Sequence, residues 1–252
     1  MTYSPGRIIC LSAEIADLCA RLGVWDRVVA VTAYADQTGL PPKPVVSGFS
    51  SGNVAAILAH QPDLVLAFSD VQAGLCGELI RAGATVFATN QRTLSEIAST
   101  MRMIASLVGR QEVGEALAAD FITAIQLLRS NRPRRPRVYF EEWPEPPVFG
   151  IPWISELIEM AGGADIFADR CSAAAKDRTV SDAEIMGADP EIIVASWCGR
   201  PVERSVIQSR LAETTAVRNG KIFELPGHCI LQPGWRLTEG FQQLRNIFDT
   251  VE

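Results

Sequence analysis

The sequence predicts an α/β fold built as two similar β/α lobes joined by one long helix. Short apolar stretches rich in β-branched residues alternate with stretches of helical spacing along the 252 residues. QPDLVLAFS at 61–69 is matched by DPEIIVASW at 189–197, and RIICL at 7–11 by RVYF at 137–140. The spacing of the matched stretches is also similar, 55 positions from Arg7 to Pro62 and 53 from Arg137 to Pro190. The two halves of the chain are therefore predicted to share one arrangement of strands and helices.

In the first half, a strand at 7–11 is followed by a helix at 15–22 and a strand at 28–32. Prolines make the next segment a loop, and GFSSGN at 48–53 is typical of the start of a helix. The remaining predicted elements are helices at 54–60, 77–82 and 94–108 and strands at 62–68 and 84–89. This alternation predicts a central parallel sheet with right-handed crossovers.

Between the halves, the segment 111–131 shows an unbroken helical pattern, with Val113, Leu117, Phe121, Ile125 and Leu128 on one stripe. Its roughly 20 residues would extend about 30 Å, and the prolines just after it end the helix. We expect a rigid helix that holds the lobes at a nearly fixed separation. The predicted boundaries are 1–108 for the first lobe, 109–132 for the connecting helix and 133–252 for the second lobe.

The second half repeats the order of the first. A strand at 137–140 is followed by a loop and helices at 154–161 and 181–187. A strand within 189–197 and another within 217–227 come next, and a helix at 237–251 closes the chain. Both lobes are thus predicted to be Rossmann-like, each with a central parallel sheet.

The composition excludes several classes of protein. With 48% apolar and 21% charged residues, the chain is expected to be a soluble globular protein. A net charge of -6 argues against a nucleic-acid surface, and no stretch is apolar over the roughly 20 residues that a membrane span needs. If Met1 is the native start, no signal peptide is present and we expect a cytoplasmic protein; removal of a leader would instead predict a periplasmic one. The six cysteines show no CxxC spacing and are expected to be reduced thiols.

Ligands of parallel α/β sheets bind outside the carboxyl ends of the strands, so the residues at those ends are the candidate site. Aromatic rings dominate the set, which suits a broad, flat ligand. The candidate binding residues are Ser12, Tyr34, Phe49, Phe68, Glu141, Trp143, Trp153, Trp197, Cys198, His228, Gln232 and Trp235. Trp153 and Trp235 are assigned to the adjoining loops.

Candidate chemical groups favour binding over catalysis. Glu141 and Glu142 should point to opposite faces of a strand, and one of them is expected to hydrogen-bond the ligand. Cys198, His228 and Cys229 are the one cluster that fits a soft metal, although a lone histidine more often has a structural role. No phosphate-binding loop, dinucleotide motif or nucleophile elbow occurs. We therefore predict no catalytic residues, no metal site and no required cofactor.

Several segments together carry a family resemblance: RIICLSAEIADLCARLG, QPDLVLA, ISELIEMAGG, DPEIIVASW and LQPGWR. The chain resembles the helical-backbone (class III) substrate-binding proteins, which present cobalamin, ferric siderophores or haem to ABC importers. It is most similar to the cobalamin-binding branch whose members lack a signal peptide.

The resemblance implies a corrinoid held in a cleft between the lobes, little hinge motion, and Phe68 in contact with the corrin. It also implies one exposed glutamate per lobe for docking on an ABC permease. Here the position near 72–74 is not acidic, and Glu203 is a loose candidate in the second lobe. A DxHxxG motif is missing, so bound cobalamin is expected to keep its own base or a water as lower ligand.

The leading hypothesis is a non-enzymatic, monomeric protein that binds cobalamin or a related corrinoid as part of an ABC-type uptake system or as a cytoplasmic carrier. A haem or ferric-siderophore receptor is the alternative in the same class. A corrinoid-processing enzyme that uses Cys198, His228 and Cys229 is the alternative from another class.

Overall fold

The computed structural model describes residues 4–170, 172 and 174–250. By contacts between residues, the chain divides into two compact units. Unit 1 contains Met1–Gln91 and Ser95–Asp120, and unit 2 contains Arg92–Leu94 and Phe121–Glu252. The division falls inside helix α5 (Gln111–Leu127), and the assignment of 109–132 as a separate connecting segment stays a prediction.

Unit 1 is built around a five-stranded sheet in which every neighbouring pair is parallel. The strand order is β3-β2-β1-β4-β5. The strands are β1 (Ile8–Cys10), β2 (Val28–Thr32), β3 (Val45–Ser47), β4 (Leu64–Phe68) and β5 (Val86–Thr89). The helices are α1 (Ala13–Arg21), α2 (Val54–Ala59), α3 (Ala73–Arg81) and α4 (Leu94–Leu107), with short 3-10 turns at Trp25–Arg27 and Asp70–Gln72.

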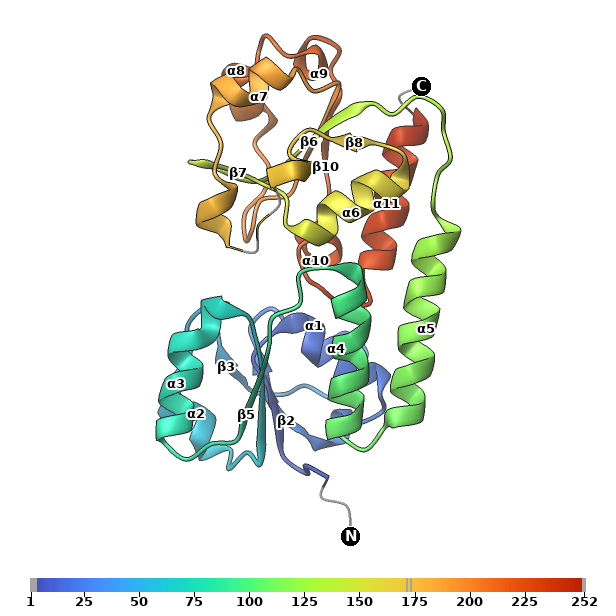
Figure 1. The fold of residues 1–252 in the computed structure, drawn as a ribbon. Helices are drawn as coiled ribbons and strands as arrows, with labels where there is room; N and C mark the ends of the chain where they lie inside the picture. The colour runs from blue at the N-terminus through green and yellow to red at the C-terminus, as the bar shows by residue number, and fades with distance from the viewer. Residues whose placement is uncertain (1–3, 171, 173, 251–252) are drawn as a thin grey trace. The chain divides into compact units, whose positions relative to one another are not determined.

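Both faces of this sheet are covered by helices, which explains why its strands read as continuous apolar runs. Ile9 and Val65 belong to a buried cluster with Ile57 of α2 and Leu79 of α3. Figure 1 shows α2 and α3 on one side of the sheet and α1 on the other. The Asn53 side chain accepts a hydrogen bond from the Ala56 amide, so the predicted start of α2 is confirmed.

Unit 2 contains a second five-stranded sheet, with strand order β10-β9-β6-β7 and β8 paired to β6. The strands are β6 (Arg137–Pro144), β7 (Pro147–Phe149), β8 (Ala164–Asp165), β9 (Ile192–Ala195) and β10 (Ile222–Glu224). The helices are α6 (Pro152–Ala161), α7 (Asp182–Ala188), α8 (Arg204–Arg210), α9 (Thr215–Arg218), α10 (Gly227–Ile230) and α11 (Leu237–Thr250), with 3-10 turns at Ala168–Arg170 and Ala175–Arg178.

The predicted α/β class with two β/α lobes is confirmed, with one difference in the second sheet. Strand β7 runs antiparallel to β6, whereas β8, β9 and β10 pair in parallel. The expected loop after 140 is therefore wrong, because β6 continues to Pro144 and turns back as β7. One face of the sheet packs on α7, α8 and α9 through residues such as Ile185, Ile207 and Ala216.

The internal repeat extends to the backbone. Ile8 of β1 pairs with Leu64 of β4, and Val138 of β6 pairs with Ile192 of β9. The residues that begin the repeated stretches, Gln61 and Asp189, both have left-handed backbone angles, with φ of 46° and 43°. This conformation is uncommon outside glycine, so its recurrence at equivalent positions supports the repeat.

Equivalent acids also anchor equivalent strands. Asp63 accepts hydrogen bonds from the Gly6 and Arg7 amides at 2.8 and 3.0 Å, just before β1. Glu191 accepts one from the Arg137 amide at 3.0 Å, at the start of β6. The third residue of QPD and of DPE therefore has the same structural role.

Other predicted boundaries need correction. Helix α5 ends at Leu127 rather than 131, and the Ser130 amide then donates to the Met160 carbonyl at 2.8 Å. Strand β3 and the short helices α8, α9 and α10 were not expected from the sequence. In the described part of the chain, no helix has the length and apolar character required to cross a membrane.

Candidate functional site

The carboxyl edge of the unit 1 sheet presents two exposed aromatic rings. Tyr34 follows β2 and is 53% exposed, and Phe49 follows β3 and is 47% exposed. Their ring centroids lie 6.5 Å apart with an interplanar angle of 89°, an edge-to-face pair. Such a pair keeps its geometry while leaving apolar surface for a ligand.

Gln72 connects the loops of this edge. Its side chain is buried, and its Oε1 accepts a hydrogen bond from the Phe68 amide at 3.1 Å. Its Nε2 donates to the carbonyls of Leu11 and Phe49, both at 2.8 Å. One amide side chain therefore fixes the loops after β1, β3 and β4, a role that sequence reasoning missed because the partners are distant in the chain.

Two predicted residues of this edge are largely inaccessible. Phe68 is 8% exposed and Ser12 is 7% exposed. Phe68 is therefore mostly a core residue, and its expected contact with a corrin stays a prediction. Beside Ser12, burial raises the pKa of Glu14 to about 7, an effect that the neighbouring Ser12 side chain opposes.

At the edge of the unit 2 sheet, two indoles lie under an arginine. Trp143 is half-buried in β6, and Trp197 follows β9 and is 3% exposed. The Arg200 guanidinium carbon lies 5.5 Å from the centroid of the Trp143 ring and 4.7 Å from that of Trp197. Both distances fit cation–π contacts. Of the two predicted indoles, Trp143 is the more accessible.

Glu141 is a buried structural acid, which corrects its predicted place on the ligand-facing surface. Its carboxylate is fully buried and accepts hydrogen bonds from Trp197 Nε1 at 3.1 Å and from the Tyr139 hydroxyl at 3.2 Å. Arg210 pairs with it at 2.9 Å and also with Asp182. Burial alone would lower the pKa of Arg210, but the bonds to both acids raise it. Glu141 thus positions the Trp197 ring.

Glu142, the next residue, lies nearer the surface. Arg178 donates to its carboxylate at 2.5 Å, and both side chains are largely buried. Burial raises the pKa of Glu142, while the charges of Arg178 and Arg92 oppose that rise. The exposed Cys198 lies close enough that Glu142 raises the pKa of its thiol, in addition to the larger effect of desolvation. No local sequence pattern predicts that Arg178 lies at this edge.

The two remaining tryptophans differ in accessibility. Trp153 is not in a loop but in the first turn of α6, fully buried, with Nε1 donating to the Ile230 carbonyl at 3.0 Å. Its predicted place in a loop is therefore wrong. Trp235 is half-buried and its ring lies 6.4 Å from that of Phe121. Gln232, between α10 and α11, is also half-buried.

The predicted sulfur and imidazole cluster is not formed. His228 is exposed on α10, whereas Cys229 is fully buried and its thiol donates to the Pro226 carbonyl at 3.2 Å. Burial is the main cause that raises the pKa of Cys229 to about 11. Among the described residues, no three His, Cys, Asp or Glu side chains are placed to hold a metal ion. Cys171 lies outside the described residues.

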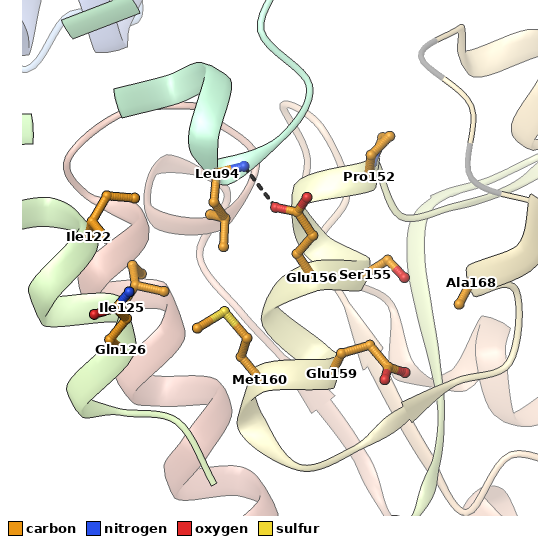
Figure 2. A pocket seen from close by; sticks show the side chains of 10 residues that line it. All are labelled: Leu94, Ile122, Ile125, Gln126, Pro152, Ser155, Glu156, Glu159, Met160 and Ala168. Atoms are coloured by element: carbon orange, nitrogen blue, oxygen red, sulfur yellow. Dashed lines mark hydrogen bonds between the residues drawn. The ribbon is translucent and has the colours of Figure 1, made fainter. Parts of the chain in front are cut away.

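A separate cavity of about 550 Å³ lies in unit 2, between the end of α5, helix α6 and the first residue of α4. Figure 2 shows apolar side chains such as Ile122, Ile125 and Met160 on its walls. Its two acids are already engaged: Glu156 Oε2 accepts from the Leu94 amide at 2.7 Å, and Glu159 pairs with Arg135. None of the predicted binding residues lines this cavity.

Comparison with known proteins places this geometry in a family. The family model described as periplasmic binding protein matches residues 8–228. The chain belongs to the periplasmic binding protein family. The predicted resemblance to substrate-binding proteins is therefore confirmed.

Relatives within this family have binding functions by name. The vitamin B12-binding protein of Vibrio cholerae is 28% identical over 259 residues, covering 96% of this chain and 88% of that protein. The crystal structure of the periplasmic vitamin B12-binding protein of Vibrio cholerae superposes with a TM-score of 0.78 at 24% identity, covering 99% of both chains. A periplasmic haem-binding protein from Roseiflexus sp. RS-1 superposes with a TM-score of 0.83 at 21% identity, covering 99% of this chain and 100% of that one. The two structural likenesses show the shared fold.

Proposed function

We propose that this periplasmic binding protein binds a corrinoid, without chemical conversion, as the substrate-binding component of an ABC-type uptake system. The observation that carries the proposal is the 28% identity to a vitamin B12-binding protein over nearly the whole chain. The aromatic side chains at the carboxyl edges of the two sheets are suited to contact a corrin ring, because that ring has broad apolar faces.

We assign the contacts by accessibility. Tyr34 and Phe49 of unit 1 and Trp143 of unit 2 present aromatic surface at strand ends. His228 is exposed, and Gln232 and Trp235 are half-buried in the segment that follows β10, where they provide polar and aromatic partners for the amide side chains of a corrinoid. Glu141 and Trp153 support these surfaces from within the core.

We infer the location and the protein partner from the family. The relatives are periplasmic binding proteins, so the cytoplasmic location expected from the sequence has no support and the periplasmic alternative fits. We propose an ABC permease as the protein partner. Glu78 and Glu203 are exposed acids on units 1 and 2, respectively, and are the candidates for docking on it.

Direct titration tests the proposal. We expect saturable binding of cyanocobalamin and aquocobalamin by absorbance and calorimetry, with slower alkylation of the exposed Cys198 in the bound state. Replacing Tyr34 or Phe49 with alanine should weaken corrinoid binding about tenfold, since truncation of a well-packed aromatic contact typically costs above 1 kcal/mol. Leu127→Ala, which removes an 81% exposed apolar side chain of α5, is the matched control and should leave affinity unchanged.

Haemin provides the competing ligand in the same assays. The absence of saturable binding of either corrinoid would overturn the proposal, and tight haemin binding under the same conditions would replace it with the haem alternative. An equal loss of affinity in the Leu127 control would show that the aromatic substitutions act through general destabilisation.

A further inference from the structure

The loop that follows β9 brings Arg200 close to the indole rings of Trp197 and Trp143. Gly199 has a φ of 74°, which allows a tight turn, and the Arg200 amide donates to the Trp197 carbonyl at 3.4 Å. The turn places the Arg200 guanidinium over the rings of Trp197 and Trp143. The position of the guanidinium therefore depends partly on the backbone conformation of this turn.

Both rings are themselves fixed. Trp197 Nε1 donates to the buried carboxylate of Glu141, and Trp143 Nε1 donates to the Glu145 carbonyl at 2.9 Å. On the guanidinium itself, one terminal nitrogen donates to Glu203 Oε1 at 3.2 Å. A planar cation with aromatic contacts and one ion pair is held in place more firmly than an ordinary surface arginine.

The remaining donors of this cation are available. A guanidinium has five N–H groups, and Glu203 is its one hydrogen-bond acceptor within the part of the chain that the structure describes. Its side chain is 39% exposed. Glu142 of β6 is paired with Arg178 rather than with Arg200. The edge thus presents a preorganised cation with free donors.

We infer that Arg200 recognises an anionic group of the bound corrinoid, and that this group is the phosphodiester of the nucleotide loop. The inference rests on the proposed function. The amide side chains around a corrin ring are neutral, and the phosphodiester is the anionic group that separates a complete cobalamin from cobinamide. Arginine pairs with phosphate oxygens through two parallel hydrogen bonds, which a neutral amide cannot match. Arg200 therefore selects complete corrinoids over those that lack the nucleotide.

A ligand comparison tests this role. Wild-type protein, Arg200→Gln and Arg200→Lys are titrated with cyanocobalamin and with dicyanocobinamide by calorimetry. We expect Arg200→Gln to weaken cyanocobalamin binding at least tenfold, the range of a hydrogen bond to a charged group, and cobinamide binding less than about threefold. Arg200→Lys keeps the charge without the planar fork and should give an intermediate loss for cyanocobalamin. The control Arg204→Ala removes an exposed charge of the same sign and should change neither affinity.

The outcomes separate this inference from the proposed function. Equal losses for both ligands would overturn it, because they would place the effect in the packing of the two indoles. Unchanged cyanocobalamin affinity in Arg200→Gln would also overturn it. A wild-type protein that binds neither corrinoid would instead contradict the proposed function. Tryptophan fluorescence of each variant verifies that the indoles keep their environment.

Discussion

Glu141 and Glu142 are neighbours in β6, yet their carboxylates have different surroundings. The alternation of a strand predicts that they point to opposite faces, but it does not say which face is the core. The answer depends on Arg210, which lies 69 positions later and holds Glu141 in the interior. Sequence reasoning found the pair and missed its roles, because an ion-pair partner that distant in the chain leaves no local signal.

Glu14 is the residue with the clearest consequence for pH. Its pKa is raised by burial from an ordinary 4.5 to about 7, so folding favours the protonated carboxyl. The folded state binds more protons than the unfolded state between these values, and this group's contribution to the free energy of unfolding therefore falls as pH rises from 4.5 to 7.

Glu14→Gln should remove this dependence. We expect the variant to match the wild type near pH 4 and to exceed its free energy of unfolding at pH 8 by an amount on the order of 3 kcal/mol. Urea denaturation across this pH range measures the difference. The control Glu112→Gln removes an exposed carboxylate in the first turn of α5 and so accounts for the loss of one surface charge. A constant difference for Glu14→Gln would contradict the assignment.

Among the elements, the long helices and buried strands were predictable, and the short ones were not. The apolar runs of β4 and β9 are buried on both faces and carry a strong pattern. Strands β3 and β7 contain three residues each, as β1 and β10 do, but they lie beside prolines in segments that were expected to be loops. Trp153 lies just before the predicted helix at 154–161, whereas the helix begins at Pro152, and proline is favoured in the first turn of a helix.

The contact between α10 and α11 depends on one glycine. A Cβ on Gly240 would lie 2.1 Å from the Cys229 carbonyl oxygen, and backbone at that distance cannot yield without moving a helix. Because His228 lies on α10, the packing of α10 against α11 also determines the position of a predicted ligand contact.

We expect Gly240→Ala to lower the free energy of unfolding by about 3 kcal/mol. The matched control is Gly187→Ala in α7, where the added Cβ would meet no heavy atom within 4 Å. That control should be neutral or stabilise by up to about 1 kcal/mol, because alanine is the better helix former. Thermal denaturation of both variants measures the contrast, and similar effects would contradict the close-packing argument.

At the scale of the whole molecule, the repeat was the most informative sequence feature. It predicted two sheets with equivalent strands, and the matched register and left-handed residues before β4 and β9 agree with it. The repeat did not predict where unit 2 departs from unit 1, namely the hairpin of β6 and β7. Departures of that kind arise from local turns that have no counterpart in the other half.

Equivalent anchors should have equivalent energetic effects. Asp63→Ala and Glu191→Ala each leave strand-leading amides without a partner, and each should lower the free energy of unfolding by about 1–2 kcal/mol. Asp63 belongs to unit 1 and Glu191 to unit 2, so the double variant should show the sum of the single effects in a urea titration. Glu213→Ala, an exposed acid, serves as the control. A large loss of stability at only one of the two sites would show that the acids are equivalent in geometry but not in their contribution to the free energy of unfolding.

The hydrogen bond between Glu156 and the Leu94 amide limits how the chain can be cut into parts that fold separately (Figure 2). The opening turn of α4 receives its acceptor from a side chain encoded 62 positions downstream. A truncated product that stops after α5 would retain every strand of the first sheet but lose that acceptor. An engineered half-protein would consequently need a substitute at the start of α4 before it could serve as an independent module.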